Sequence, residues 1–299
     1  MEIYKLSTWL KEYGWRHLVG LTFVVFSMYP ILYVVANSFA DFPNLENSKL
    51  IPDSFTLKHF QSLYGDPLVP YFKWLFNTYK IASLAGFFNV LLGTFAGYAF
   101  ARLKFRGRRV GLITLVLIQM FPAFLAFVAI YLLFFQISDI APFMGLGTHF
   151  GLICVYLGGS IGFNSWLIKG FMDTIPESLD EAAKVDGATG IQSFWRITFP
   201  LLMVSISPLL IGSFAFNFNN FTLIFLLSGG GPPIIGSEVS VGWTDILISF
   251  TYKLAISGGR GNLFGLASSV TIIIFALVLI ISAISFRYTK RLERIYGNI

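Results

Sequence analysis

The chain has 299 residues, of which 56% are hydrophobic, 17% are aromatic and only 12% are charged. A soluble domain carries about 25% charged residues, so this composition excludes an ordinary soluble protein and indicates an integral membrane protein. The net charge is +6, but the basic residues cluster beside apolar segments, which favours a membrane topology over nucleic-acid binding.

Six apolar segments are long enough to cross a membrane, because a spanning helix needs about 20 mostly apolar residues. We expect a cytoplasmic N-terminal segment at 1–17 and a single all-α membrane domain at 18–299. The predicted spans are 18–40, 78–101, 110–135, 151–169, 199–227 and 263–286. The first is longer than the apolar core of a signal peptide, about 7–15 residues, so we interpret it as a retained span.

Lys and Arg gather in four places: before the first span, after the second, around residues 169–196 and after the sixth. Six spans place all four on the same side of the membrane. Basic residues favour the cytoplasmic side. We therefore expect a multi-pass protein of the bacterial or archaeal inner membrane, with both termini and the loop at 170–198 in the cytoplasm.

The loop at 170–198 interrupts the apolar sequence with the polar stretch LDEAAKVDGATG. Thr174 followed by Glu177 predicts a capping box, and Gly187 suits the left-handed end of a helix. We predict a short helix over Ser178–Asp186 and a second over Ile191–Arg196.

The first of these loop helices has two explanations that the residues alone support equally. One is a solvated helix with no partner. The other is a docking helix, whose Asp180 and Glu181 offer carboxylates to a basic cytosolic partner and whose small alanines allow close approach.

The spacing of this segment resembles the EAA motif of bacterial ABC importer permeases, which reads E-A-A, three residues, G, nine residues, I, any residue, L and P. The matching residues are Glu181, Ala182, Ala183, Gly187, Ile197 and Pro200. Phe199 replaces the usual Leu, which is a conservative apolar change.

Other segments resemble the maltose/maltodextrin branch of that family. YAFARLKFRG, QMFPAFLAFVAIY and VYLGGSIGFNSWLIKGF are similar to one membrane subunit of such importers, whereas SFAFNFNNF, FTYKLA and FGLASS are similar to the other. The resemblance implies a coupling helix between spans four and five that docks on a cytoplasmic ATPase. It further implies two ATPase copies that bind ATP and Mg, a second permease subunit that is a paralogue, and an external solute-binding protein that delivers an oligosaccharide.

Polar residues in the fifth span mark a candidate solute path, because such residues usually face the protein interior. Ser213, Asn217 and Asn220 share one helix face at i, i+4 and i+7, with Phe216 beside them. Amides and an aromatic ring suit a sugar, although helix–helix hydrogen bonding also explains them. The resemblance implies that Phe216, Asn217 and Asn220 contact sugar, and it gives matching positions in the fourth span to Tyr156, Ser160 and Phe163.

Two other functional classes can be weighed against the sequence, a secondary transporter and a membrane enzyme. A secondary transporter usually carries ionisable residues within its spans, and these spans are nearly free of them. A membrane enzyme would need a nucleophile–base set or a metal cluster, and neither pattern occurs; the Walker A pattern for ATP is also absent.

The identity of the sugar stays open, with maltodextrin implied by resemblance and trehalose as an alternative. The Gly-rich segments at 229–231 and 258–261 are explained either as turns, or as contacts with the binding protein or a gate.

Overall fold

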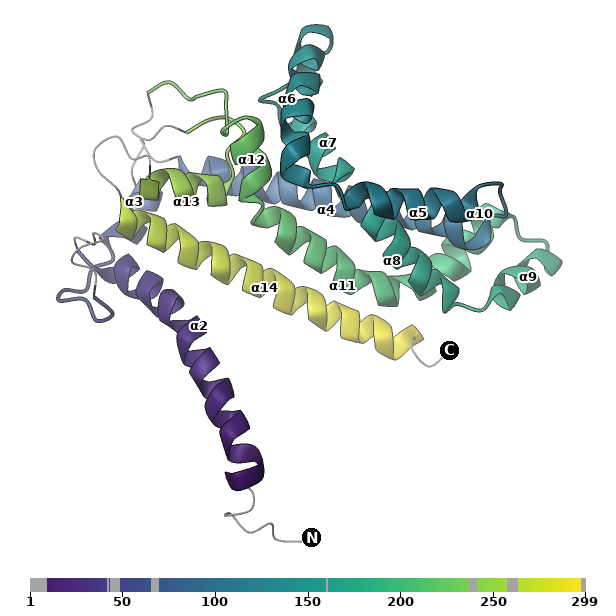
Figure 1. Cartoon of the computed structure of the whole chain (residues 1–299), viewed down its shortest axis with the longest axis horizontal. Helices are drawn as coiled ribbons and strands as arrows, with labels where there is room; N and C mark the ends of the chain where they lie inside the picture. The colour runs from purple at the N-terminus through teal and green to yellow at the C-terminus, as the bar shows by residue number, and fades with distance from the viewer. Residues whose placement is uncertain are drawn as a thin grey trace.

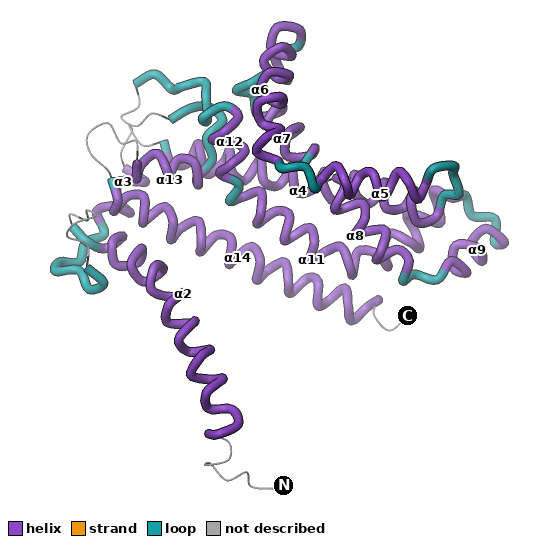
Figure 2. Tube along the Cα trace, viewed as in Figure 1, coloured by secondary structure: helices purple, strands orange, loops and turns teal. Residues whose placement is uncertain are grey.

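In the computed structural model of the chain, nearly all of the apolar segments form helices (Figure 2). The structure describes residues 10–41, 43, 49–65, 70–159, 161–236, 241–256 and 263–296. Within these ranges there is no β-strand, and only the pairs Ala40–Phe55 and Pro233–Gly242 form isolated bridges. The predicted all-α class is therefore confirmed.

The longer helices follow one another along the chain with short connections (Figure 1). They are α2 (Trp15–Phe39), α3 (Lys58–Gly65), α4 (Tyr71–Arg102), α5 (Arg108–Gln119), α6 (Ala123–Ile140), α7 (His149–Gly158), α8 (Ile161–Asp173), α9 (Glu177–Val185), α10 (Gly190–Ser193), α11 (Phe199–Phe218), α12 (Phe221–Leu227), α13 (Leu247–Ile256) and α14 (Phe264–Tyr296). A π-helical turn at Phe194–Thr198 joins α10 to α11.

In the part of the chain that the structure describes, four helical stretches are long and apolar enough to cross a membrane, namely Glu12–Phe39, Tyr71–Arg102, Gly190–Phe218 and Phe264–Arg291. The bent pair α7 and α8 makes a fifth if it counts as one span, with 53° between its halves. The predicted count of six spans is thus not reached by helix length and composition among the described residues, and it stays a prediction.

The predicted span at 110–135 is not one helix, because α5 ends at Gln119 and α6 begins at Ala123. Pro122 explains the break: a proline lacks the backbone N–H and disfavours helical geometry at the residue before it. Helix α6 accordingly rises steeply from the end of α5 (Figure 1).

The predicted span at 199–227 is also divided. Helix α11 ends at Phe218, and Asn220 caps the separate short helix α12, its side chain accepting a hydrogen bond from the Leu223 N–H at 3.5 Å. Two further helices, α3 and α13, lie in segments that the sequence suggested were loops.

Helix α4 is the centre of the packing. Gly93 and Gly97 let α8 approach closely, since a Cβ at either position would lie 2.9 Å from Asn164 or Ile168. Small residues spaced by four along a helix commonly allow such contacts in membranes. On another side, Gly86 lies against the α11 backbone at Phe214. A movement of α4 would therefore displace both α8 and α11.

Helix α2 behaves differently from the others. Only its last turn is buried, at Ala36, Asn37 and Ser38, where the Ser38 carbonyl accepts a hydrogen bond from Ser269 of α14 at 3.4 Å. The rest of the helix extends away from the body (Figure 1). Its apolar side chains are exposed, which suits a helix surrounded by lipid.

Candidate functional site

The polar loop between α8 and α11 contains the helix that the sequence predicted, now bounded as Glu177–Val185. Its predicted N-terminal capping box is wrong. The Thr174 hydroxyl instead donates to the Phe171 carbonyl at 2.7 Å, which closes the end of α8, and Pro176 occupies the N-cap position of α9 without a side-chain cap.

A capping box does form one helix later in the chain. At α10 the Thr189 hydroxyl accepts from the Gln192 N–H at 3.3 Å, and the Gln192 side chain accepts from the Thr189 N–H at 2.9 Å. The sequence prediction missed it because Thr189 lies inside a stretch of small residues.

The C-terminus of α9 matches the prediction. Gly187 has φ +83°, the left-handed region that favours glycine. Its N–H donates to Lys184 at 3.1 Å, and the Ala188 N–H donates to Ala183 at 2.9 Å. These two bonds make a Schellman motif, which fixes the angle at which α10 leaves α9.

Asp180 does not face a partner, contrary to the prediction. It is buried, and one carboxylate oxygen accepts from Arg102 Nε at 3.0 Å. The other accepts from the hydroxyls of Ser193 at 2.7 Å and Thr198 at 2.9 Å. Sequence reasoning missed this network because Arg102 lies 78 residues away and pairs with Asp180 only through the fold.

The remaining surface of α9 is open. Glu181 and Ala182 are exposed, whereas Ala183 is buried against the body, so the two alanines of the motif lie on different faces. The apolar side chains of Val185 and Ile191 are 87% and 74% exposed. A carboxylate beside exposed apolar side chains forms a surface suited to binding another protein.

A polar hollow of about 250 Å³ lies where α9 turns into α10. It is lined by Asp186, Gly187, Ala188, Gln192, Ser193, Arg196 and Ile197. Gly187 is exposed, and Ile197 and Pro200 are half-buried at the entrance to α11. The residues of the motif thus form one continuous region from α9 to the first turn of α11.

The polar residues of the fifth predicted span divide into two groups. Ser213 and Asn217 lie on α11, where the Asn217 amide donates to the Ser213 carbonyl at 2.7 Å. Asn220 does not share their helix face, because α11 has already ended at Phe218. Asn217 is 2% exposed and its amide oxygen has no hydrogen-bond partner, while Phe216 is 67% exposed. A buried amide oxygen without a partner is uncommon and calls for an explanation.

The fourth predicted span supplies a contact to this region. Tyr156 on α7 is buried, and its hydroxyl donates to the Asn220 carbonyl at 3.0 Å. Phe163 on α8 is exposed. Ser160 lies outside the described residues. The structure therefore joins Tyr156 to Asn220 but leaves Phe163 apart.

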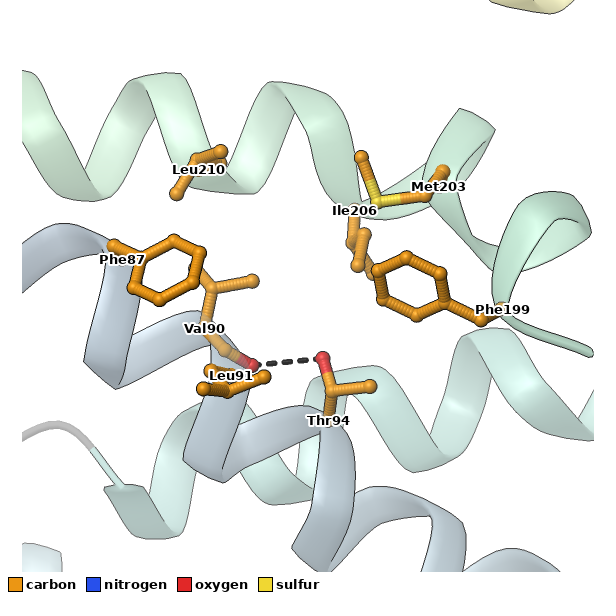
Figure 3. Close-up of a pocket in the computed structure, with 8 residues that line it drawn as sticks. All are labelled: Phe87, Val90, Leu91, Thr94, Phe199, Met203, Ile206 and Leu210. Carbon is orange, nitrogen blue, oxygen red and sulfur yellow. Dashed lines mark hydrogen bonds between the residues drawn. The ribbon is translucent and has the colours of Figure 1, made fainter. Parts of the chain in front are cut away.

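Helices α4 and α11 enclose a small apolar pocket of about 100 Å³ (Figure 3). It is lined by Phe87, Val90, Leu91 and Thr94 from α4 and by Phe199, Met203, Ile206 and Leu210 from α11. The Thr94 hydroxyl donates to the Val90 carbonyl at 2.7 Å, so it is already satisfied within its own helix. None of the predicted sugar contacts lines this pocket.

A wider groove of about 840 Å³ lies beside α5, α6 and α7, with Gln119, Cys154 and Gly159 among its mostly apolar lining. None of the predicted sugar contacts lines this groove either. Within the described ranges, no group of three or more His, Cys, Asp or Glu side chains is placed to hold a metal ion.

Comparisons with known proteins agree on one family. Residues 89–294 match the family described as "Binding-protein-dependent transport system inner membrane component". The chain is 40% identical over 217 residues to the maltose/maltodextrin transport system permease protein MalG of Vibrio vulnificus strain YJ016, covering 69% of this chain and 73% of that protein.

Two solved structures share the fold. A bacterial ABC transporter that imports the acidic polysaccharide alginate aligns with a TM-score of 0.74 at 17% identity, over 96% of this chain and 99% of that one. A second structure shows an alginate transporter in complex with an alginate pentasaccharide-bound periplasmic protein, with a TM-score of 0.72 at 18% identity, over 96% and 98%.

The family match covers more than half of the chain and includes the whole α9–α11 region and the central part of the helical body. The chain therefore belongs to the family of binding-protein-dependent transport system inner membrane components, and it is a multi-pass permease subunit of an ABC importer, a transport protein rather than an enzyme.

Proposed function

We propose that this chain forms half of the pathway by which a neutral oligosaccharide of the maltose/maltodextrin type enters the cytoplasm, driven by ATP hydrolysis in separate ATPase subunits. The observation that carries the proposal is the α9 surface. It presents an exposed carboxylate and apolar side chains at the tip of a loop whose ends continue directly into α8 and α11.

Coupling through α9 follows from its local structure. The Schellman motif fixes its C-terminus and Asp180 fixes its buried face. A helix held in this way moves as a unit with the elements that flank it. Glu181 and the exposed Val185 then serve as the contacts that an ATPase subunit grips.

The proposed orientation places α9 in the cytoplasm. Helix α4 has 32 residues, which corresponds to about 48 Å, and its Arg102 end contacts the α9 region, next to the basic segment at 102–109. At its other end, Lys73 lies over the Trp243 ring at 3.3 Å, and Lys253 pairs with the buried Asp245 at 2.7 Å. The positive-inside rule thus favours the Arg102 end as cytoplasmic, together with both termini.

A neutral sugar suits this pathway better than an acidic one. No Asp, Glu, Lys or Arg occurs from Ile197 to Ser237, whereas an acidic polysaccharide would favour basic groups along its path. The free amide oxygen of Asn217 and the exposed ring of Phe216 supply a hydrogen-bond acceptor and an apolar face. The MalG relative transports maltose/maltodextrin, which favours that class over trehalose.

The partners follow from what one chain supplies. The chain contributes one wall of a pathway, so a second permease, a paralogue, contributes the other. Two copies of the ATPase bind ATP and Mg and dock on the two coupling helices. A solute-binding protein delivers the sugar on the opposite side; one transporter of similar fold forms a complex with an alginate pentasaccharide-bound periplasmic protein.

The substrate prediction is tested by competition in proteoliposomes that contain the full complex and its binding protein. Uptake of labelled maltotriose is measured against unlabelled maltodextrins, trehalose and alginate trisaccharide. We expect maltodextrins to compete at concentrations about tenfold or more below the others, a difference of about 1.4 kcal/mol. Equal or better competition by trehalose or alginate trisaccharide would refute the substrate class while leaving the transporter class intact.

A further inference from the structure

A single buried carboxylate joins α9 to the adjoining ends of α4 and α11. Asp180 belongs to α9, Arg102 is the last residue of α4, and Thr198 immediately precedes α11. All of these side chains are buried: Arg102 is 8% exposed and Asp180 is 12% exposed, and Ser193 and Thr198 are also inaccessible. Four helical elements therefore meet at one side chain: α9, α4, α10 and the π-helical turn that leads into α11.

Both carboxylate oxygens of Asp180 accept hydrogen bonds from buried donors. Asp180 receives Arg102 Nε on one oxygen and the Ser193 and Thr198 hydroxyls on the other. Arg102 Nη2 also donates to the Ile175 carbonyl, at 2.7 Å, in the link before α9. Charge-assisted hydrogen bonds are shorter and stronger than neutral ones, so this contact resists separation of α9 from α4.

Glu181, the residue after Asp180, shows that the two faces of α9 have different surroundings. Glu181 follows Asp180 directly, and consecutive residues point about 100° apart around a helix. Glu181 is exposed and Asp180 is buried. One face is open to a partner, while the other is attached to the membrane helices.

The two helices joined by Asp180 are the same two that enclose the small pocket in Figure 3. Val90 and Thr94 come from α4, and Met203 and Ile206 come from α11. A displacement of α9 transmitted through Asp180 would act on both walls together. Without the Asp180 carboxylate, the backbone would still link α9 to α11. The ion pair between α9 and Arg102 of α4 would be lost.

We propose that Asp180 and Arg102 are positioning residues, which convert movement of the coupling helix into a concerted movement of α4 and α11. This inference rests on the proposed function, because it presumes that an ATPase moves α9. It assigns the pair neither to ATPase docking nor to contact with the sugar.

The test measures ATP hydrolysed per sugar transported in purified, reconstituted complexes carrying Asp180→Asn or Arg102→Gln. We expect complexes to assemble and hydrolyse ATP within about twofold of the unmodified protein while the ratio of ATP to sugar rises about tenfold. The double variant should be no worse than either single variant, because the two residues act as a unit. Asp53→Asn is the matched control: it makes the same chemical change at an exposed carboxylate in the loop before α3 and should leave the ratio unchanged.

A second variant keeps the proposal testable if the Asp180→Asn protein does not fold. Ser193→Ala with Thr198→Val removes only the hydroxyl donors and keeps the ion pair, and it should raise the ratio about threefold. Equal loss of ATPase activity and transport, or an unchanged ratio in the variants that fold, would overturn the proposal. The proposed function fails separately, if Glu181→Lys complexes assemble normally, since that result concerns docking and not the ratio.

Discussion

Replacing Glu181 with Lys is expected to abolish assembly with the ATPase subunits and thereby coupled transport. Glu181 is exposed on α9, where its carboxylate faces the proposed partner. Reversing the charge places a cation against the basic surface that we propose for the partner, and like-charge contacts at interfaces cost several kcal/mol. A loss of about 100-fold or more in affinity follows. The measurement is co-purification of the ATPase with the tagged permease, together with sugar uptake.

The control for this prediction is Asp53→Lys. Asp53 is also an exposed carboxylate, but it pairs with Lys49 in the loop before α3, on the side that we assign to the exterior. It should leave assembly and uptake unchanged. The thermal unfolding of the Glu181→Lys permease should also be unchanged, since the side chain is exposed on α9. Normal assembly and normal uptake in Glu181→Lys would refute the docking role of α9.

Replacing Asn217 with Ala should impair sugar transport far more than assembly. The Asn217 amide oxygen is buried without a partner, and its amide nitrogen bonds only to Ser213, one turn earlier on the same helix. Loss of a hydrogen bond to sugar costs about 1.5 kcal/mol, so the KM for maltotriose should rise about tenfold. The measurement is the concentration dependence of uptake in proteoliposomes.

Asn219→Ala is the matched control for Asn217→Ala. Asn219 makes an equivalent bond to the Ala215 carbonyl at 3.1 Å, but its side chain is exposed. The control therefore removes the same chemical group and the same kind of local bond. Its KM should stay unchanged. If Asn217→Ala instead dissociates the complex without raising the KM, then the residue joins helices and does not contact sugar.

The parts of the fold that follow from local rules could be predicted from the sequence. The apolar runs gave the all-α class, and Gly187 marked the end of α9 because few other residues adopt positive φ. The break before α6 was readable in principle, since Pro122 interrupts the run. The prediction treated 110–135 as one span because hydropathy averaged over a window does not register a single proline.

The errors concern features that depend on tertiary contacts or on competing caps. Asn220 was placed on one face with Asn217 by assuming that the helix continued, but asparagine also favours helix ends, and here it caps α12. Asp180 was interpreted as a surface residue because its buried partner Arg102 comes from another helix. Local sequence shows that a carboxylate is present but does not show which distant residue neutralises it.

The central claim is that this permease moves sugar only when a separate ATPase drives it. The most direct test compares proteoliposomes with the permease chain alone against proteoliposomes with the full complex, each given binding protein, labelled maltotriose and either internal ATP or an imposed proton gradient. We expect uptake and binding-protein-stimulated ATP hydrolysis only in the full complex with ATP. Proton-driven uptake by the chain alone, or ATP hydrolysis by the purified chain, would contradict it.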